Sequence, residues 1–77
     1  MQKPEKPTSE LEILGRNIKQ LRENSGIKQD DLADAVGVKD GRTIRFWEKG
    51  INAPTFAHMV KLAKIFGISM QELLKDL

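Results

Sequence analysis

The sequence predicts an all-α fold, a compact bundle of five short helices in a single domain. Apolar residues recur at helical spacing, capping residues open most of these runs, and glycines close them. No segment shows the strict alternation of apolar and polar residues that is typical of a half-buried strand. A chain of 77 residues buries only about 60% of its unfolded surface, so its stability has to come from one tight core.

The first helix is expected to follow a short flexible tail. Residues 1–8 combine prolines and charges with no apolar residue beyond the initiator, which predicts a flexible N-terminal tail ahead of a domain over residues 9–77. Ser9 and Glu12 have the spacing of a capping box, and the helix is predicted from about Glu10 to about Ser25, with Gly26 ending it. Its apolar stripe is expected to hold Leu11, Leu14, Ile18 and Leu21.

Two short helices come next. The second is predicted to open at Gln29, although Lys28 is a poor cap, and to stop at Gly37. Its buried side is expected to hold Leu32, Ala33, Ala35 and Val36. Asp40 is a good cap for a third helix, which is predicted to run through Lys49 and to be closed by Gly50.

The last two helices are separated from the third by a loop, because Asn52 and Pro54 discourage a continuous helix. Thr55 is predicted to cap a fourth helix that Gly67 ends. Its inner side is expected to hold Phe56, Met59, Val60, Ala63 and Phe66. Ser69 and Glu72 form a second capping box, which predicts a fifth helix containing Leu73, Leu74 and Leu77.

Composition excludes several classes of protein. Without cysteine the chain forms no disulfide scaffold and no thiolate metal site. The N-terminal residues lack the apolar region of a signal peptide, and no apolar run approaches the roughly 20 residues that span a bilayer, so a soluble cytoplasmic protein is expected. Nucleotide-binding loops and His/Cys clusters are absent from the sequence. We therefore expect no enzyme, no cofactor, no metal, no membrane partner and no small-molecule ligand.

Four features follow one another between Leu14 and Leu74: LRENSGIKQDDLADAVGV, TIRFWEKG, a proline, and KLAKIFGISMQELL. In this order they resemble the phage-repressor (Cro/XRE-type) helix-turn-helix family. The resemblance implies a lambda-repressor-like DNA-binding domain, in which the second and third helices form the helix-turn-helix and the third enters the major groove. It also implies a small transcriptional regulator, a repressor, associated with the nucleoid. It further implies a homodimer formed through the fifth helix, where Leu73, Leu74 and Leu77 are expected to be partly spare.

The chain departs from this family in the turn before the third helix. Four residues, 39–42, separate Val38 from Thr43, where the family usually has three. The additional residue predicts either a longer turn or an extra residue at the start of the third helix.

The third helix is predicted to carry the DNA-binding surface. Ile44 and Trp47 point to the core, while an outward stripe at i, i+3, i+4 and i+7 holds Arg42, Arg45, Phe46 and Lys49. These three cations form a local positive patch that the net charge of +2 conceals. The guanidinium of Arg42 matches the O6/N7 edge of guanine, whereas Arg45 could reach a base or a phosphate and Lys49 is expected at a phosphate.

Other assignments are less specific. Phe46 could pack on thymine methyl groups or cover the loop near Ile51, and Thr43 could cap, touch a phosphate or reach a base. Lys39 and Gly41 complete the predicted contacts to double-stranded DNA. His58 is expected to be solvent-exposed, without a second ligand nearby.

The resemblance assigns three further residues. It implies that Gln29 contacts a DNA phosphate and braces the third helix. It also implies that Arg22 and Glu48 form a largely buried salt bridge between the first and third helices.

A function of a different class stays open from the sequence. The chain could be a protein-interaction module, such as an antitoxin or a complex subunit, that keeps this fold and binds a protein through its third or fifth helix. The additional residue in the turn and the outward Phe46 keep this alternative open. The salt dependence of DNA binding discriminates between the two functions, because contacts to phosphates release counterions.

Overall fold

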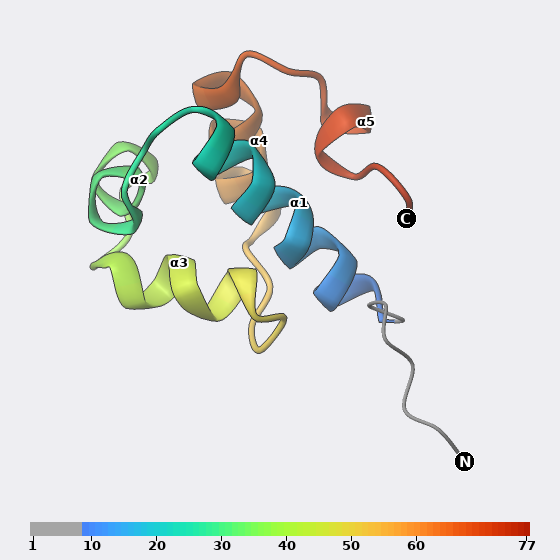
Figure 1. The fold of residues 1–77 in the computed structure, drawn as a ribbon, viewed down its shortest axis with the longest axis horizontal. Helices are drawn as coiled ribbons and strands as arrows, with labels where there is room; N and C mark the ends of the chain where they lie inside the picture. The colour runs from blue at the N-terminus through green and yellow to red at the C-terminus, as the bar shows by residue number, and fades with distance from the viewer. Residues whose placement is uncertain (1–8) are drawn as a thin grey trace.

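The structure, a computed structural model, describes residues 9–77, which form five helices and no strand (Figure 1). The predicted tail of residues 1–8 lies outside the described residues. The helices are α1 Glu10–Asn24, α2 Gln29–Val36, α3 Gly41–Glu48, α4 Phe56–Phe66 and α5 Met70–Leu73. The predicted all-α bundle of five helices is confirmed. None of these helices is both long and apolar enough to cross a lipid bilayer.

Side-chain caps define where most of the helices begin. The hydroxyl groups of Ser9 and Ser69 accept hydrogen bonds from the backbone three residues later, and both predicted capping boxes form. α4 has a capping box of an unusual kind, in which the N–H of Thr55 donates to Nδ1 of His58 at 3.4 Å. No side chain caps α2, as the lysine at position 28 predicts.

His58 is therefore not the simple solvent-exposed histidine that the sequence predicts. Its side chain is half-buried, and its ring lies 5.3 Å from the ring of Trp47, at an interplanar angle of 39°. The error arose because histidine rarely takes the place of glutamate in a capping box, so the spacing from Thr55 carried no signal.

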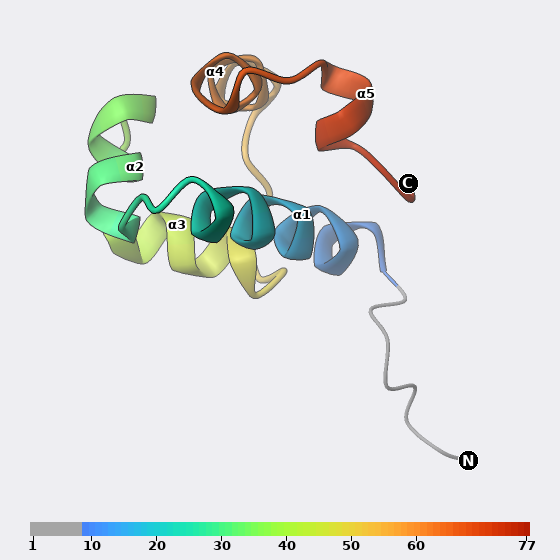
Figure 2. The same cartoon turned by 45° about the horizontal axis from the view of Figure 1, so that its top comes forward.

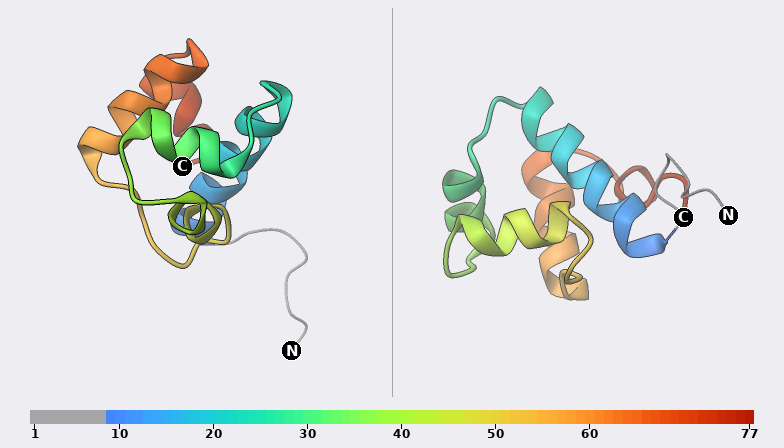
Figure 3. Two further views of the ribbon diagram at one scale, coloured as in Figure 1. Left: turned by 90° about the vertical axis from the view of Figure 1, so that its left-hand side faces the viewer. Right: turned by 60° about the horizontal axis from the view of Figure 1, so that its bottom comes forward.

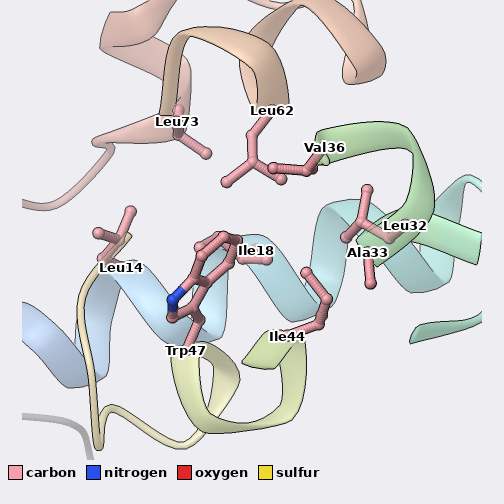
Figure 4. Close-up of a cluster of buried hydrophobic side chains, with 9 residues drawn as sticks. All are labelled: Leu14, Ile18, Leu32, Ala33, Val36, Ile44, Trp47, Leu62 and Leu73. Atoms are coloured by element: carbon pink, nitrogen blue, oxygen red, sulfur yellow. The ribbon is translucent and has the colours of Figure 1, made fainter. Parts of the chain in front are cut away.

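One core joins the five helices (Figure 4). It consists of Leu14 and Ile18 of α1, Leu32, Ala33 and Val36 of α2, Ile44 and Trp47 of α3, Leu62 of α4, and Leu73 of α5. Fully burying one large aliphatic side chain contributes about 1.5–3 kcal/mol. Since α3 supplies two of the largest side chains, the core fixes the inner side of this helix firmly.

Several predictions about the core are wrong. Phe56 is 70% exposed because it opens the first turn of α4, at the edge of the bundle, and Leu62 is the fully buried residue of that helix. Ala35 is exposed, since α2 turns only Leu32, Ala33 and Val36 inward. Leu11, in the first turn of α1, is 37% exposed. Leu73, predicted to be partly spare, is fully buried.

α1 and α3 cross at very short range. A Cβ atom on Gly15 would lie 2.3 Å from the carbonyl oxygen of Trp47 and 2.7 Å from that of Glu48. Only glycine permits this approach. Figure 2 shows α3 alongside α1, with α4 and α5 above α1 in this view.

The helix-turn-helix itself has a normal turn. Residues 37–40 connect α2 to α3, as the right-hand view of Figure 3 shows, within the usual three to four residues. Gly37 takes the left-handed conformation at φ +89°. Gly41 and Arg42 form the first residues of α3, so the longer 39–42 segment is divided between the turn and the helix.

A buried amide attaches the C-terminal segment to α1. Asn17 is 8% exposed, and its Nδ2 donates to the carbonyl oxygens of Leu73 at 2.9 Å and Lys75 at 2.8 Å. An ion pair of 3.4 Å between Arg16 and Asp76 lies beside it. Together these contacts hold α5 and the residues that follow it against α1.

Candidate nucleic-acid interface

The two sides of α3 differ in their exposure to solvent. Ile44 and Trp47 are 0% and 4% exposed. On the outer side Arg42, Arg45 and Lys49 are exposed, and Thr43 and Phe46 are half-buried. The helix therefore presents two guanidinium groups and an ammonium group to solvent while its backbone is held by the core.

Arg22 and Glu48 lie together where α1 passes the end of α3. Nε of Arg22 donates to Oε2 of Glu48 at 2.5 Å, and an NH2 group donates to Oε1 at 3.2 Å. The two side chains are 13% and 4% exposed. The hydrogen bond to Glu48 raises the pKa of Arg22, against the smaller opposing effect of burial. A third bond joins NH1 to the carbonyl oxygen of Ile27 at 3.0 Å, so each of the three guanidinium nitrogens makes a hydrogen bond.

Gln29 joins the start of α2 to this ion pair. Its Nε2 donates to Oε1 of Glu48 at 3.0 Å. One amide thus links α2 to the end of α3, and the side chain remains partly exposed at the surface.

A hollow of about 300 Å³ lies beside these residues, and we call it the basic hollow. It is lined by Lys19, Arg22, Gln29, Arg45, Glu48 and Lys49. The carboxylate of Glu48 is neutralised by Arg22, so the excess positive charge comes from Lys19, Arg45 and Lys49. An anion is the ligand that this charge favours.

Lys19 also lines the basic hollow, although it is not among the residues predicted from the sequence. It is exposed on α1, one helical turn before Arg22. The i, i+3 spacing of two cations was the available signal, but only the fold reveals that this face of α1 adjoins the end of α3.

The opposite end of α3 is acidic. A second hollow, near the turn, is lined by Asp30, Asp31, Ala33, Asp34, Val38, Lys39 and Asp40. Gly41 is buried there, and its N–H donates to Oδ1 of Asp30 at 2.9 Å. The structure therefore places the predicted contact residue Gly41 in a packing role, whereas Lys39 is exposed beside the turn.

Metal-ligating side chains are not clustered in the part of the chain that the structure describes. Residues 9–77 contain no group of three or more His, Cys, Asp or Glu that could hold a metal ion. In the same part of the chain, every buried side-chain nitrogen and oxygen atom has a hydrogen-bond partner. The chemistry that this surface offers is ionic and hydrogen-bonding contact with an anionic partner.

Sequence comparisons identify related proteins. A model of the helix-turn-helix family matches residues 18–73. The cryptic phage CTXphi transcriptional repressor RstR of Vibrio cholerae is 34% identical over 64 residues, which cover 83% of this chain and 57% of the relative. The chain thus spans little more than half the length of this curated relative.

Solved structures share the fold. The restriction-modification controller protein C.AhdI of Aeromonas hydrophila superposes with a TM-score of 0.77 and 27% identity, over 86% of this chain and 98% of that protein. The P22 c2 repressor, crystallised in complex with a synthetic operator, has a TM-score of 0.74 and 31% identity, over 80% and 92%. A hypothetical transcription factor, NHTF, from Neisseria has a TM-score of 0.77 over 96% and 87%, but at 23% identity it supports the fold alone.

Proposed function

The chain belongs to the helix-turn-helix family, of the phage-repressor (Cro/XRE) type, and we propose that it binds double-stranded DNA sequence-specifically as a small transcriptional regulator. One observation carries the proposal: α3 exposes a basic face while its other face is locked into the core. An α-helix of this kind fits the major groove, which is about 12 Å wide. RstR, a transcriptional repressor, and the P22 c2 repressor with its operator support the same function.

In this proposal the exposed side chains of α3 read the bases. Arg42 forms a bidentate contact with a guanine, because its guanidinium offers two parallel donors to O6 and N7. Arg45 reaches a base edge or a phosphate one turn further along. Thr43 and Phe46 lie between the two arginines and the core, where a methyl or ring face suits a thymine methyl group.

The phosphate backbone occupies the basic hollow in this proposal. Lys19, Arg45 and Lys49 supply positive charge there, and Gln29 offers the remaining hydrogen-bonding capacity of its amide. The amides in the first turn of α2 also have no side-chain cap, which leaves them available to a phosphate oxygen. Lys39 contacts the backbone from the turn. Such contacts fix the register of α3 without reading sequence.

We also propose a repressor that acts as a homodimer on the DNA of the nucleoid. A single small module makes few contacts, and helix-turn-helix proteins of this class bind two half-sites about 34 Å apart as two-fold dimers. Leu77 is 48% exposed and Leu74 is half-buried beside it, so apolar surface is available at the C-terminal end of the bundle.

The salt dependence of binding to a duplex tests this function. Affinity should fall linearly with salt on logarithmic axes, because each neutralised phosphate releases counterions with a slope of about 0.9 per contact. A variant without its exposed cations on α3, Arg42→Ala with Arg45→Ala, serves as the control and should lose both affinity and slope. Absence of measurable duplex binding at low salt would contradict the proposal and would favour the protein-interaction module.

A further inference from the structure

Two aspartates satisfy the first amide groups of α3. Oδ1 of Asp40 accepts from the N–H of Arg42 at 3.0 Å, and its carbonyl oxygen accepts from the N–H of Thr43 at 3.2 Å. The N–H of Gly41 donates instead to Oδ1 of Asp30, at 2.9 Å. Asp40 is an ordinary local cap, whereas Asp30 lies on α2, eleven residues earlier in the chain. The bond from Asp30 therefore crosses the whole turn of the helix-turn-helix.

The contact between Asp30 and Gly41 depends on glycine. A Cβ atom at position 41 would lie 2.3 Å from Oδ1 of Asp30, closer than packed atoms tolerate, and 3.0 Å from the backbone nitrogen of Asp30, which is a tight contact. Gly41 also belongs to the 39–42 segment, which is one residue longer than the family pattern. The segment that distinguishes this chain thus contains the residue that lets α2 hold the start of α3.

The neighbouring acids do not share this arrangement. Asp31 and Asp34 are exposed on the same helix, and in residues 9–77 neither side chain makes a hydrogen bond or an ion pair. A carboxylate near a DNA-binding surface repels phosphates, so its charge alone opposes binding. Asp30 differs from these neighbours in having a structural contact of its own.

We propose that Asp30 is a positioning residue for base recognition, which fixes the start of α3 against α2 and so directs Arg42 at its base. The inference rests on the proposed function. Arg42 directly follows Gly41, and a bidentate contact to guanine requires both donors to be aligned with O6 and N7. Without the bond, no side-chain hydrogen bond among residues 9–77 joins the start of α3 to α2, although the two helices still pack together in the core. Asp30 itself touches no DNA and acts through the backbone of α3.

The test compares the base preference of four variants with that of the wild type. Preference is the ratio of affinities for the selected operator and for the same operator substituted at the base pair that Arg42→Ala identifies. In Asp30→Ala and Gly41→Ala this ratio should fall about tenfold, since one specific base contact is misaligned. Asp30→Asn keeps an oxygen acceptor and should retain the preference. Asp31→Ala removes the same charge from the same turn, and it should retain the preference and bind all sequences slightly more tightly.

The ratio is insensitive to the folded fraction of a variant, because unfolded protein lowers both affinities equally. An Asp30→Ala variant that behaves as Asp31→Ala does, with tighter binding and unchanged preference, would overturn the inference while leaving the proposed function intact. A wild type that prefers no sequence would instead overturn the proposed function, and this inference with it.

Discussion

Arg22 and Glu48 form a two-point ion pair that ties α1 to the end of α3, with Nε and an NH2 group of the arginine bonded to separate carboxylate oxygens. The pair is almost enclosed, and Gln29 adds a third donor to Glu48. It has two consequences. α3 is held to both helices that precede it, and the negative charge of Glu48 is cancelled beside the basic hollow.

Removal of Glu48 alone should destabilise the domain. Glu48→Ala leaves the guanidinium of Arg22 buried without its partner, which costs about 3–5 kcal/mol. Since small domains have a total stability of about 5–15 kcal/mol, we expect partial unfolding. The double variant Arg22→Met with Glu48→Leu should be milder, because no buried charge remains. Thermal melts of the wild type, Arg22→Met, Glu48→Leu and the double variant measure the coupling, and a value within about 0.5 kcal/mol of additivity would contradict the pairing.

Arg42 and Lys49 should differ in what their removal changes. Arg42→Ala is expected to cost about 1–3 kcal/mol on the preferred operator and to relax preference at one base pair. Lys49→Ala should weaken binding to all sequences alike and should reduce the salt slope by about one. Binding titrations on operator and substituted duplexes at several salt concentrations measure both effects. Equal, sequence-independent losses would show that Arg42 does not read a base.

Lys19 should behave as a phosphate contact although it lies on α1. Lys19→Ala removes one of three unpaired cations from the basic hollow, and it should lower the salt slope by about one with no change in base preference. Lys64→Ala is the matched control, because Lys64 is exposed on α4, away from the hollow. If the salt slope of DNA binding is unchanged in both variants, Lys19 does not contact a phosphate and α1 is not part of the interface.

Self-association should depend on Leu77. Deleting the segment from Leu73 onward would not test this, because Leu73 is a fully buried core residue. Leu77→Lys places a charge on the exposed apolar end instead, and it should weaken dimers in sedimentation experiments and reduce binding to a two-half-site operator more than to one half-site. Gln71→Lys adds the same charge on α5 and should have little effect. A wild type that stays monomeric on DNA would contradict the dimer.

The sequence predicted the helices well because their boundaries are local. The residues that cap α1 and α5 lie within three positions of the amides they satisfy, and this spacing is visible in the chain. The fourth helix illustrates the limit. Its apolar residues were correctly recognised as a helix, but only the fold determines that Leu62 lies inside and Phe56 outside.

Contacts between distant segments could not be predicted in the same way. The side-chain amide of Asn17 donates to carbonyl groups more than fifty residues away, and the sequence around this asparagine does not predict those acceptors. The same holds for Gly15, whose need for glycine arises from the carbonyl oxygens of Trp47 and Glu48. The bond between Asp30 and Gly41 also required the structure, since Asp30 reads in the sequence as a favourable charge at a helix start.

Sequence-specific DNA binding through α3 can be tested by selecting bound duplexes from a random library. We expect enrichment of a palindromic motif whose half-sites are separated by about one helical turn, or 34 Å. The same selection with Arg42→Ala should lose one base preference in each half-site. Failure of the wild type to enrich any sequence, under salt conditions where it binds duplex DNA, would show that α3 does not read base sequence.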